Sequence, residues 1–275
     1  MRHIARVFGS PWSGVFGTDI ESTRQYDRHW HETFGVGVLE QGAHRSLSGR
    51  GTVDAFPGDV ITTNPEEVHD GRPLIAPSRR WRMVYFAPDV LHAMLEPSSP
   101  GGRDIALTQP VIRDAVLTRV VRRLIADLEH WHRTSPTGLD RLRLDESLTR
   151  VCERLLECHA TTSVSRTPRP ALDAVCDRLA DDVCGSPSLA ELAAIVALSR
   201  YQLLRHFERV FGVTPHGWLR QLRVERARAA IRTGADLVRA AADCGFADQS
   251  HMTRAFVAHF GFTPGAWARA TRRRR

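Results

Sequence analysis

Short apolar stretches broken by glycine and proline fill the first 90 residues. Residues 34–39 and 60–63 are two such stretches, and glycine or proline recurs between them at short intervals. Many short stretches with frequent turn signals predict the strands of a β-sandwich or barrel. Residues 81–86 form a later strand of this kind, and the two-residue period of a strand places on one face Trp81, Met83 and Tyr85.

A helical period follows a turn or loop predicted at residues 96–103. Apolar residues then recur at spacings of three and four, the period of an α-helix. Two runs, separated by Ser135–Gly138, consist of Leu117, Val120, Val121, Leu124, Leu128 and Trp131, and of Leu148, Val151, Cys152, Leu155 and Leu156. We predict two helices in residues 106–160 that cover the β domain and offer an apolar face to a second subunit.

Residues 161–170 show neither period. This stretch is polar and contains two prolines, which predicts a linker between domains. The pattern after it is helical as far as the arginines at 272–275. We therefore expect an α+β chain composed of a ligand-sensing β domain at 1–105, a helical dimerisation segment at 106–160, the linker, and an all-α domain at 171–275.

The all-α domain contains one unit twice, at an offset of 49 residues. Residues 205–220 and 254–269 match at eight of sixteen positions without a gap. Upstream, the same offset pairs similar residues, namely Leu189 with Val238, Ala193 with Ala242 and Leu203 with Met252. A match of this length indicates a duplicated structural unit.

The first copy carries the signals of two short helices joined by a tight turn. Capping boxes begin at Ser188 and Ser199, so the first helix must end near Ala197. Gly212 ends the second helix, and Pro215 opens the next one.

The second copy repeats these signals. Asp236 and Asp248 cap its two helices, Gly245 lies in the turn, and Gly261 ends the second helix. A long helix through residues 218–231 is predicted to join the copies. Paired short helices of this kind are typical of the helix-turn-helix motif, whose second helix contacts DNA.

Charge supports DNA as the partner of this domain. The chain has a net charge of +7, and all its basic residues other than histidine are arginine. Residues 171–275 carry +6 of this charge and residues 1–170 only +1. A basic module attached to a near-neutral one is typical of a polyanion binder with a separate sensor.

Cysteine usage and hydropathy exclude other classes of protein. The five cysteines form no CxxC pair, which argues against a zinc finger or a disulfide framework. No apolar run approaches the roughly 18 residues that span a bilayer, and the N-terminus lacks the apolar core of a signal peptide. We expect a cytoplasmic protein that does not associate with membranes.

Arginines at equivalent points favour DNA binding over a bundle that merely packs twice. Phe207 and Phe256 belong to the core under either hypothesis. Arg205 and Arg254, however, lie on the outward face of the second helix of each unit, near Gln202. Arginine and glutamine can hydrogen-bond to base edges in the major groove.

Most of residues 171–270 resemble the DNA-binding domain of the AraC/XylS family of transcription regulators. The second copy carries the resemblance through Gly245, Phe246, Phe256, residues 260–264 and Trp267, which stands where the family often has tyrosine. The resemblance implies a sequence-specific regulator, more often an activator, that enters two successive major grooves of promoter DNA. It places base-facing positions at Arg200, Tyr201, Leu204 and Arg205, and at Gln249, Ser250, His251 and Arg254.

Two of these positions have restricted chemistry. Leu204 could contact only a thymine methyl group or a base carbon, since it cannot donate a hydrogen bond. His251 could contact phosphate instead of a base.

The N-terminal domain resembles the cupin-type sensor of the same family in residues 29–32, 57–65 and 68–69. The resemblance implies an antiparallel barrel that holds a small ligand. The residues that we expect to face this ligand are His29, His31, Glu32, His69, Trp81 and Tyr85. Trp81 and Tyr85 could equally be aromatic core residues.

Three of these histidines raise the question of a metal. An HxH pair on a strand puts two imidazoles on one face, and His69 could complete a site. Metal-binding cupins carry a further glutamate four to five residues past the second histidine, where this chain has Gly35 and Val36. The nearest acids are Glu32 and Glu40. We therefore expect no metal and no other cofactor.

Three functions compete. The one we expect is a ligand-responsive, non-enzymatic regulator that forms a homodimer, binds promoter DNA and a small effector, and contacts RNA polymerase if it activates. The second is a metal-dependent cupin enzyme joined to a DNA-binding domain, which would need a metal at His29, His31 and His69. The third is an architectural DNA protein, which would leave 160 N-terminal residues unexplained.

Overall fold

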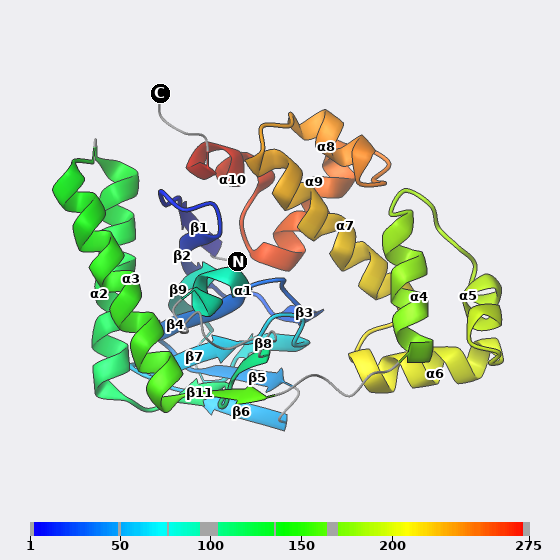
Figure 1. The fold of residues 1–275 in the computed structure, drawn as a ribbon, viewed down its shortest axis with the longest axis horizontal. Helices are drawn as coiled ribbons and strands as arrows, with labels where there is room; N and C mark the ends of the chain where they lie inside the picture. Colours follow the sequence, from blue (N-terminus) through cyan, green and yellow to red (C-terminus); the bar gives the residue numbers. More distant parts are fainter. Residues whose placement is uncertain are drawn as a thin grey trace. The chain divides into compact units, whose positions relative to one another are not determined.

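The computed structural model describes residues 3–48, 51–75, 77–93, 104–134, 136–163 and 170–271. The chain divides into two compact units, unit 1 (residues 1–166) and unit 2 (residues 167–275) (Figure 1). The loop predicted at 96–103, residues 164–169 of the predicted linker and the four terminal arginines lie outside the described residues.

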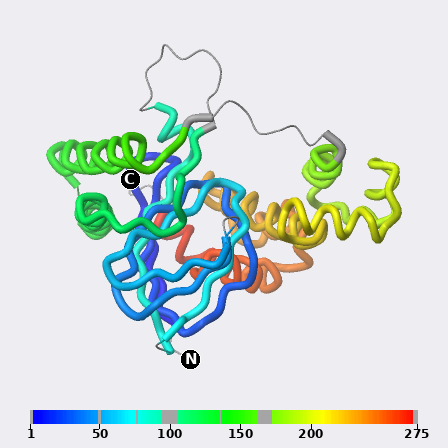
Figure 2. Tube along the Cα trace, turned by 90° about the horizontal axis from the view of Figure 1, so that it is seen from below, coloured from blue at the N-terminus to red at the C-terminus, as the bar shows by residue number. Residues whose placement is uncertain are grey.

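Unit 1 is built from antiparallel strands. One sheet has the order β1 (His3–Phe8), β2 (Val15–Ser22), β9 (Arg79–Phe86), β4 (Phe34–Gln41), β7 (Val60–Thr63) and β11 (Val111–Ile112). A second sheet has the order β3 (Tyr26–His29), β8 (His69–Pro73), β5 (His44–Ser48) and β6 (Gly51–Ala55). In Figure 2 these strands curve around one another. Among the described residues, the strands that the sequence predicted as an antiparallel barrel or sandwich pair as separate sheets that do not close on one another.

The six-stranded sheet is apolar on both faces. On its outer face, Val36, Val84 and Phe86 pack with residues of the two long helices. On its inner face, Trp81 and Met83 pack with Ala55 of the other sheet, and Tyr85 lies against this second cluster. The predicted common face of Trp81, Met83 and Tyr85 is therefore confirmed.

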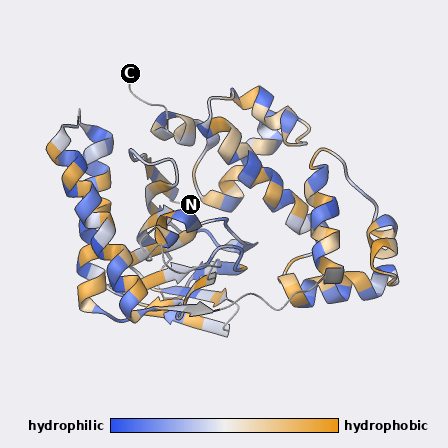
Figure 3. Ribbon diagram, in the orientation of Figure 1, coloured by the Kyte–Doolittle hydropathy of each residue, from blue (hydrophilic) through white to orange (hydrophobic). Residues whose placement is uncertain are grey.

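Both helices predicted between residues 106 and 160 are present. They are α2 (Ala115–Arg133) and α3 (Gly138–Cys158), preceded by the short α1 (Pro88–His92). Asp114 caps α2, and Thr137 with Asp140 forms a capping box at the start of α3. Hydrophobic and hydrophilic residues alternate along both helices, as the colours of Figure 3 show. None of the helices in the described part of the chain is long and apolar enough to span a membrane.

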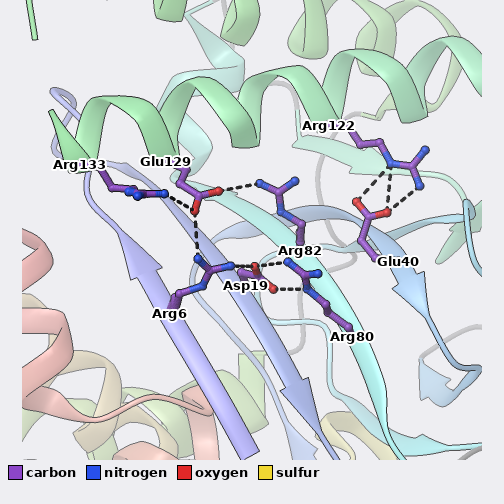
Figure 4. Close-up of polar contacts among 8 residues, drawn as sticks. All are labelled: Arg6, Asp19, Glu40, Arg80, Arg82, Arg122, Glu129 and Arg133. Carbon is purple, nitrogen blue, oxygen red and sulfur yellow. Dashed lines mark hydrogen bonds and ion pairs between the residues drawn. The ribbon is translucent and has the colours of Figure 1, made fainter.

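An ionic network fastens α2 to the outer face of the six-stranded sheet (Figure 4). Buried Asp19 of β2 accepts hydrogen bonds from Arg6 of β1 and Arg80 of β9. Glu129 of α2 accepts from Arg6 at 3.1 Å and from Arg82 of β9 at 3.3 Å. One helix and three strands are thus held together by charges at the edge of the apolar layer.

The segment predicted as a linker begins as a strand. β12 (Ala160–Ser163) pairs antiparallel with β10 (Asp104–Leu107), so Thr161 lies opposite Ala106. This pairing holds the strand that follows α3 against the strand that precedes α2. Threonine is common in strands, so the sequence of β12 suits this structure.

Unit 2 is entirely helical in its described part. Its helices are α4 (Pro170–Asp181), α5 (Leu189–Ile195), α6 (Arg200–Phe211), α7 (Pro215–Arg232), α8 (Leu237–Asp243), α9 (Gln249–Phe260) and α10 (Pro264–Thr271). Ser188, Ser199, Asp236 and Asp248 are the N-caps that the sequence predicted. The long α7 joins the copies, as expected (Figure 1).

The upstream part of the repeat departs from the expected offset of 49. α6 and α9 do begin 49 residues apart, but α5 and α8 begin 48 residues apart, at Leu189 and Leu237. The pairing of Leu189 with Val238 and of Ala193 with Ala242 was therefore wrong. Ala193 corresponds to buried Ala241, whereas Val238 is 66% exposed. The reason is that the second turn has one residue more.

Candidate functional site

Two helices of equal length occupy equivalent places in the two copies. α6 and α9 each have 12 residues, and a capping side chain accepts a hydrogen bond from the backbone N–H of Gln202 in α6 and of His251 in α9. Each helix ends at a glycine in the left-handed conformation, Gly212 (φ 70°) or Gly261 (φ 79°). Because both ends are fixed in the same way, side chains at matching positions have matching directions.

The outward face of α6 holds most of the residues that the sequence predicted there. Arg200, Tyr201, Gln202 and Arg205 are exposed, and Leu204 is half-buried. Arg205 Nη1 lies 3.4 Å from the Tyr201 hydroxyl, so the two side chains form one continuous surface across a helical turn. The Gln202 side-chain oxygen accepts from the Ser199 N–H at 3.0 Å, so its NH2 group is what it can offer to a base.

The face of α9 is similar, with one exception. Gln249, Ser250 and Arg254 are exposed. His251 is half-buried, with its ring 5.3 Å from the Phe246 ring and its Nδ1 3.5 Å from the Ala247 N–H. The turn therefore holds the His251 ring, which leaves this residue less free to read a base.

The two helices present cations without nearby acids on the same face. No aspartate or glutamate occurs in the first seven residues of α6 or of α9. Behind them, Phe207 and Phe256 are fully buried at equivalent positions and anchor each helix to its unit. This arrangement suits contact with a polyanion, with arginine as a donor to base edges.

The sensor unit brings three histidines together on its inner side. His29 and His69 are paired across β3 and β8, with ring centroids 4.4 Å apart. His31 lies 4.9 Å from the His29 ring and 5.4 Å from the His69 ring. The ring of Tyr85 lies 5.8 Å from that of His31. Four of the six predicted ligand-facing residues therefore cluster.

Hydrogen bonds to the backbone fix two of these imidazoles. His29 Nδ1 lies 2.7 Å from the Asp27 carbonyl oxygen, and His69 Nδ1 lies 2.9 Å from that of Glu67. A carbonyl oxygen can only accept, so each Nδ1 donates, and in the neutral imidazole each Nε2 then carries the lone pair. One ring nitrogen from each of the three histidines lies within 4.8 Å of the other two, which would allow them to hold a metal ion.

The remaining two predicted residues lie elsewhere. Glu32 is exposed and is not part of the histidine cluster. Trp81 is buried on the inner face, at the other end of β9 from Tyr85.

Around Trp81 lie residues that the sequence did not predict at this site. Arg79 is 1% exposed, and its guanidinium carbon is 4.8 Å from the centre of the Trp81 ring. Tyr26 lies 5.8 Å from Trp81, edge to face, and His44 lies 6.4 Å from it. The two-residue period that placed Trp81 inward also places Arg79 inward, so the signal was available for that residue. No such signal exists for His44 or Tyr26, which reach the site from other strands.

Comparisons with known proteins agree with this division of the chain. Residues 14–151 match the model of the AraC-like ligand binding domain, and residues 192–270 match that of a helix-turn-helix domain. The chain is 26% identical over 232 residues to YbfI of Bacillus subtilis (strain 168), described as an HTH-type transcriptional regulator; the match covers 83% of this chain and 82% of YbfI.

Two further comparisons cover the DNA-binding part and the fold. RhaS of Escherichia fergusonii, an HTH-type transcriptional activator, is 36% identical over 87 residues, 31% of each chain. A variant of apo ToxT from Vibrio cholerae strain SCE256 has the same fold, with a TM-score of 0.52, 9% identity and 98% of each chain covered. Since the ligand-binding model alone spans half of the chain and a helix-turn-helix domain follows it, the chain belongs to the AraC family of DNA-binding transcription regulators.

Proposed function

We propose that the chain is a ligand-responsive regulator that reads a specific promoter sequence through α6 and α9, in two successive major grooves. The observation that carries this proposal is the matching pair of capped helices with exposed Arg205 and Arg254 at equivalent positions. An exposed arginine near the start of a recognition helix can bond to the O6 and N7 atoms of guanine. The regulator would act in the cytoplasm.

Selection of binding sites from random duplex DNA, followed by footprinting, tests this proposal. We expect one motif per subunit with two informative blocks about one helical turn apart. Arg205→Ala should remove the sequence preference within one block, and Arg254→Ala within the other. Arg178→Ala, an exposed arginine on α4, serves as the control and should leave both blocks intact. Equal binding to all sequences would contradict the proposal.

We place the effector on the inner side of the sheets of unit 1. His29, His31, His69, Trp81 and Tyr85 line this side and combine aromatic surface with hydrogen-bonding nitrogen atoms. An effector changes DNA binding only if its affinity differs between two arrangements of the protein. Glu32 is left out of the proposed site because it is exposed.

We propose activation as the regulatory outcome, with RNA polymerase as a partner. The support is the similarity of the DNA-binding part to RhaS, which is described as an activator. Transcription in vitro from a promoter that contains the selected motif measures the outcome directly. A fall in transcript on addition of the protein would show repression instead.

A homodimer through the helical segment of unit 1 completes the proposal. Leu139 is 79% exposed and Leu142 is 56% exposed, and their spacing of three places them on one side of α3. Sedimentation should show a dimer that Leu139→Glu with Leu142→Glu converts to a monomer. A wild-type chain that sediments as a monomer would remove this part of the proposal.

The histidine cluster supports a second candidate function, a metal-binding sensor or a cupin enzyme. Two lone pairs fixed by backbone hydrogen bonds are what a metal site needs. Elemental analysis of the purified chain separates the candidates. A stoichiometric first-row metal that His69→Ala removes would favour the second candidate, whereas metal-free protein that binds its selected motif would favour the first.

A further inference from the structure

A buried cation lies on the inner face of β9, separated from the histidine cluster by Tyr26, whose ring centroid is 6.3 Å from that of His29. Arg79 is 1% exposed, and its guanidinium carbon lies 4.8 Å from the Trp81 ring and 5.8 Å from the Tyr26 ring. The next residue, Arg80, points to the opposite face and pairs with Asp19. The two side chains are chemically identical, but they lie on opposite faces of the sheet.

Arg79 has neutral partners. Its Nε donates to His44 Nδ1 at 2.7 Å, and its Nη1 donates to the carbonyl oxygen of Arg24 at 2.9 Å. Its Nη2 is buried and has no hydrogen-bond partner among the described residues. Within the same part of the chain, no carboxylate forms an ion pair with the guanidinium.

The charge on Arg79 is present at neutral pH. Burial lowers the pKa of Arg79 to about 10, which still leaves the guanidinium protonated. Burial lowers the pKa of His44 to about 3, so His44 is neutral and its Nδ1 can accept the hydrogen bond from Arg79. A full positive charge between two sheets without a counter-ion is unfavourable for the folded state.

Other buried polar atoms on the inner face also lack hydrogen-bond partners among the described residues. Thr18 of β2 and Thr63 of β7 are buried or half-buried, and their hydroxyl oxygens lack hydrogen-bond partners among the described residues. A region that only held two sheets together would be expected to be apolar or to satisfy its polar groups internally. Two unsatisfied hydroxyls level with Met83 and Tyr85, on the same face as the unpaired cation at Arg79, indicate a polar ligand instead.

We propose that the effector is a small organic carboxylate whose carboxyl group pairs with Arg79 and whose body packs against Trp81. This inference rests on the proposed role of unit 1 as the sensor. Carboxylate is the natural partner of a guanidinium, because parallel N–H donors match its two oxygens. Nη2 is covered by protein in this structure, so a side chain of the inner face must move when the ligand binds. Such a movement would couple binding of the effector to a second conformation of the protein.

Thermal unfolding of the full chain with a fixed set of compounds tests the inference. The set is acetate, butyrate and benzoate, each compared with its amide and with sodium chloride at equal ionic strength. We expect at least one carboxylate to raise Tm in a saturable manner, and its amide to have no such effect. Arg79→Met should abolish the shift. Arg72→Met, which removes an exposed arginine of β8, should retain it.

The stability of Arg79→Met without ligand distinguishes a binding residue from a structural one. Methionine removes a buried unpaired charge and keeps an apolar stem, so Tm should not fall. A lowered Tm for Arg79→Met, together with no carboxylate effect on the wild type, would overturn the inference. If Arg79→Met does not fold, Arg79→Lys keeps the charge and must keep the preference for the carboxylate over its amide; loss of that preference also overturns it.

Failure of this inference and failure of the proposed function give different results. If site selection yields no motif but a carboxylate still stabilises the chain through Arg79, only the proposed DNA recognition fails. If the motif is found but amides stabilise the wild type and Arg79→Met as well as carboxylates do, only the choice of a carboxylate fails.

Discussion

The charged residues of β2 and β9 illustrate how the face of a strand determines the surroundings of a charge. Arg80 and Arg6 both bond to Asp19, whose side chain is 4% exposed. Burial alone would raise the pKa of Asp19, but the hydrogen bonds from Arg80 and Arg6 outweigh it and hold the pKa below its usual value. Asp19 is therefore charged in the folded chain and stabilises it at neutral pH.

Asp19→Asn should lower the free energy of unfolding by about 1.5–3 kcal/mol at pH 7, since hydrogen bonds to a charged group are lost. A lowered folded pKa contributes stability above the unfolded pKa of about 3.9 and loses it as pH falls through the folded value. The difference between wild type and variant should thus shrink below about pH 4. Urea unfolding across pH measures this, with Asp54→Asn, a half-buried carboxylate paired with Arg45, as the control with a smaller effect.

Arg205 offers a second test at one position. Its exposed side chain can form two bonds to guanine, and Arg205→Ala should cost about 1–3 kcal/mol of discrimination at one base pair while relaxing the preference there. Binding of the variant to the selected site and to its single-base variants gives this number. Equal weakening on every sequence would assign Arg205 to the phosphate backbone.

At the scale of elements, the turns after α5 and α8 both need a residue in the left-handed conformation, but they use different residue types for it. The turn after α5 places Ala197 at φ 52°, and the turn after α8 places Gly245 at φ 73°. Left-handed backbone costs a residue with a Cβ roughly 1–2 kcal/mol, whereas glycine adopts it freely. A Cβ at Gly245 would also come within 2.6 Å of the Val183 carbonyl oxygen.

Exchanging these residues should have opposite effects on the two turns. Gly245→Ala should destabilise unit 2 by about 2 kcal/mol or more, because it adds backbone strain and a contact with the backbone. Ala197→Gly should be neutral or stabilise by about 0.5 kcal/mol, since relief of strain exceeds the entropy that glycine loses. Chemical denaturation of both variants provides the comparison, and equal losses would show that the turns are not under the inferred strain.

Elements whose ends carry caps could be predicted from the sequence, and elements that depend on distant pairing could not. Ser199 and Gly212 bound α6 through contacts a few residues away, so their chemistry is local. β12 forms because it pairs with β10. No pattern in residues 160–163 indicates which strand they pair with. The same holds at the site, where strand period places Arg79 inward but pairing between strands brings His44 and Tyr26 to it.

At the scale of the whole molecule, the two units have separate cores. Units 1 and 2 divide at residues 166 and 167, and each half of the family match falls within one unit. Sensing and DNA reading are therefore expected to be separable functions.

A fragment of residues 167–275 should fold cooperatively, bind the selected motif and show no Tm response to any carboxylate. Calorimetry and binding by fluorescence anisotropy measure the two properties. The full chain should bind a two-site promoter more tightly than the fragment, because dimerisation raises the effective concentration of the second unit. A fragment that fails to fold would mean that the units depend on each other.

The unbroken helix α7 has a consequence for promoter architecture. Its 18 residues span about 27 Å, and each residue turns the helix by about 100°. Inserting one alanine in its middle would therefore rotate one helix-turn-helix unit about the α7 axis relative to the other. The distance between the two units would change by only about 1.5 Å. Such a variant should reject the original promoter, because a rotation of about 100° turns one recognition helix away from the groove that it enters. The rotational position of the two recognition helices about α7, more than the distance between them, must therefore match the spacing of the two blocks in the promoter.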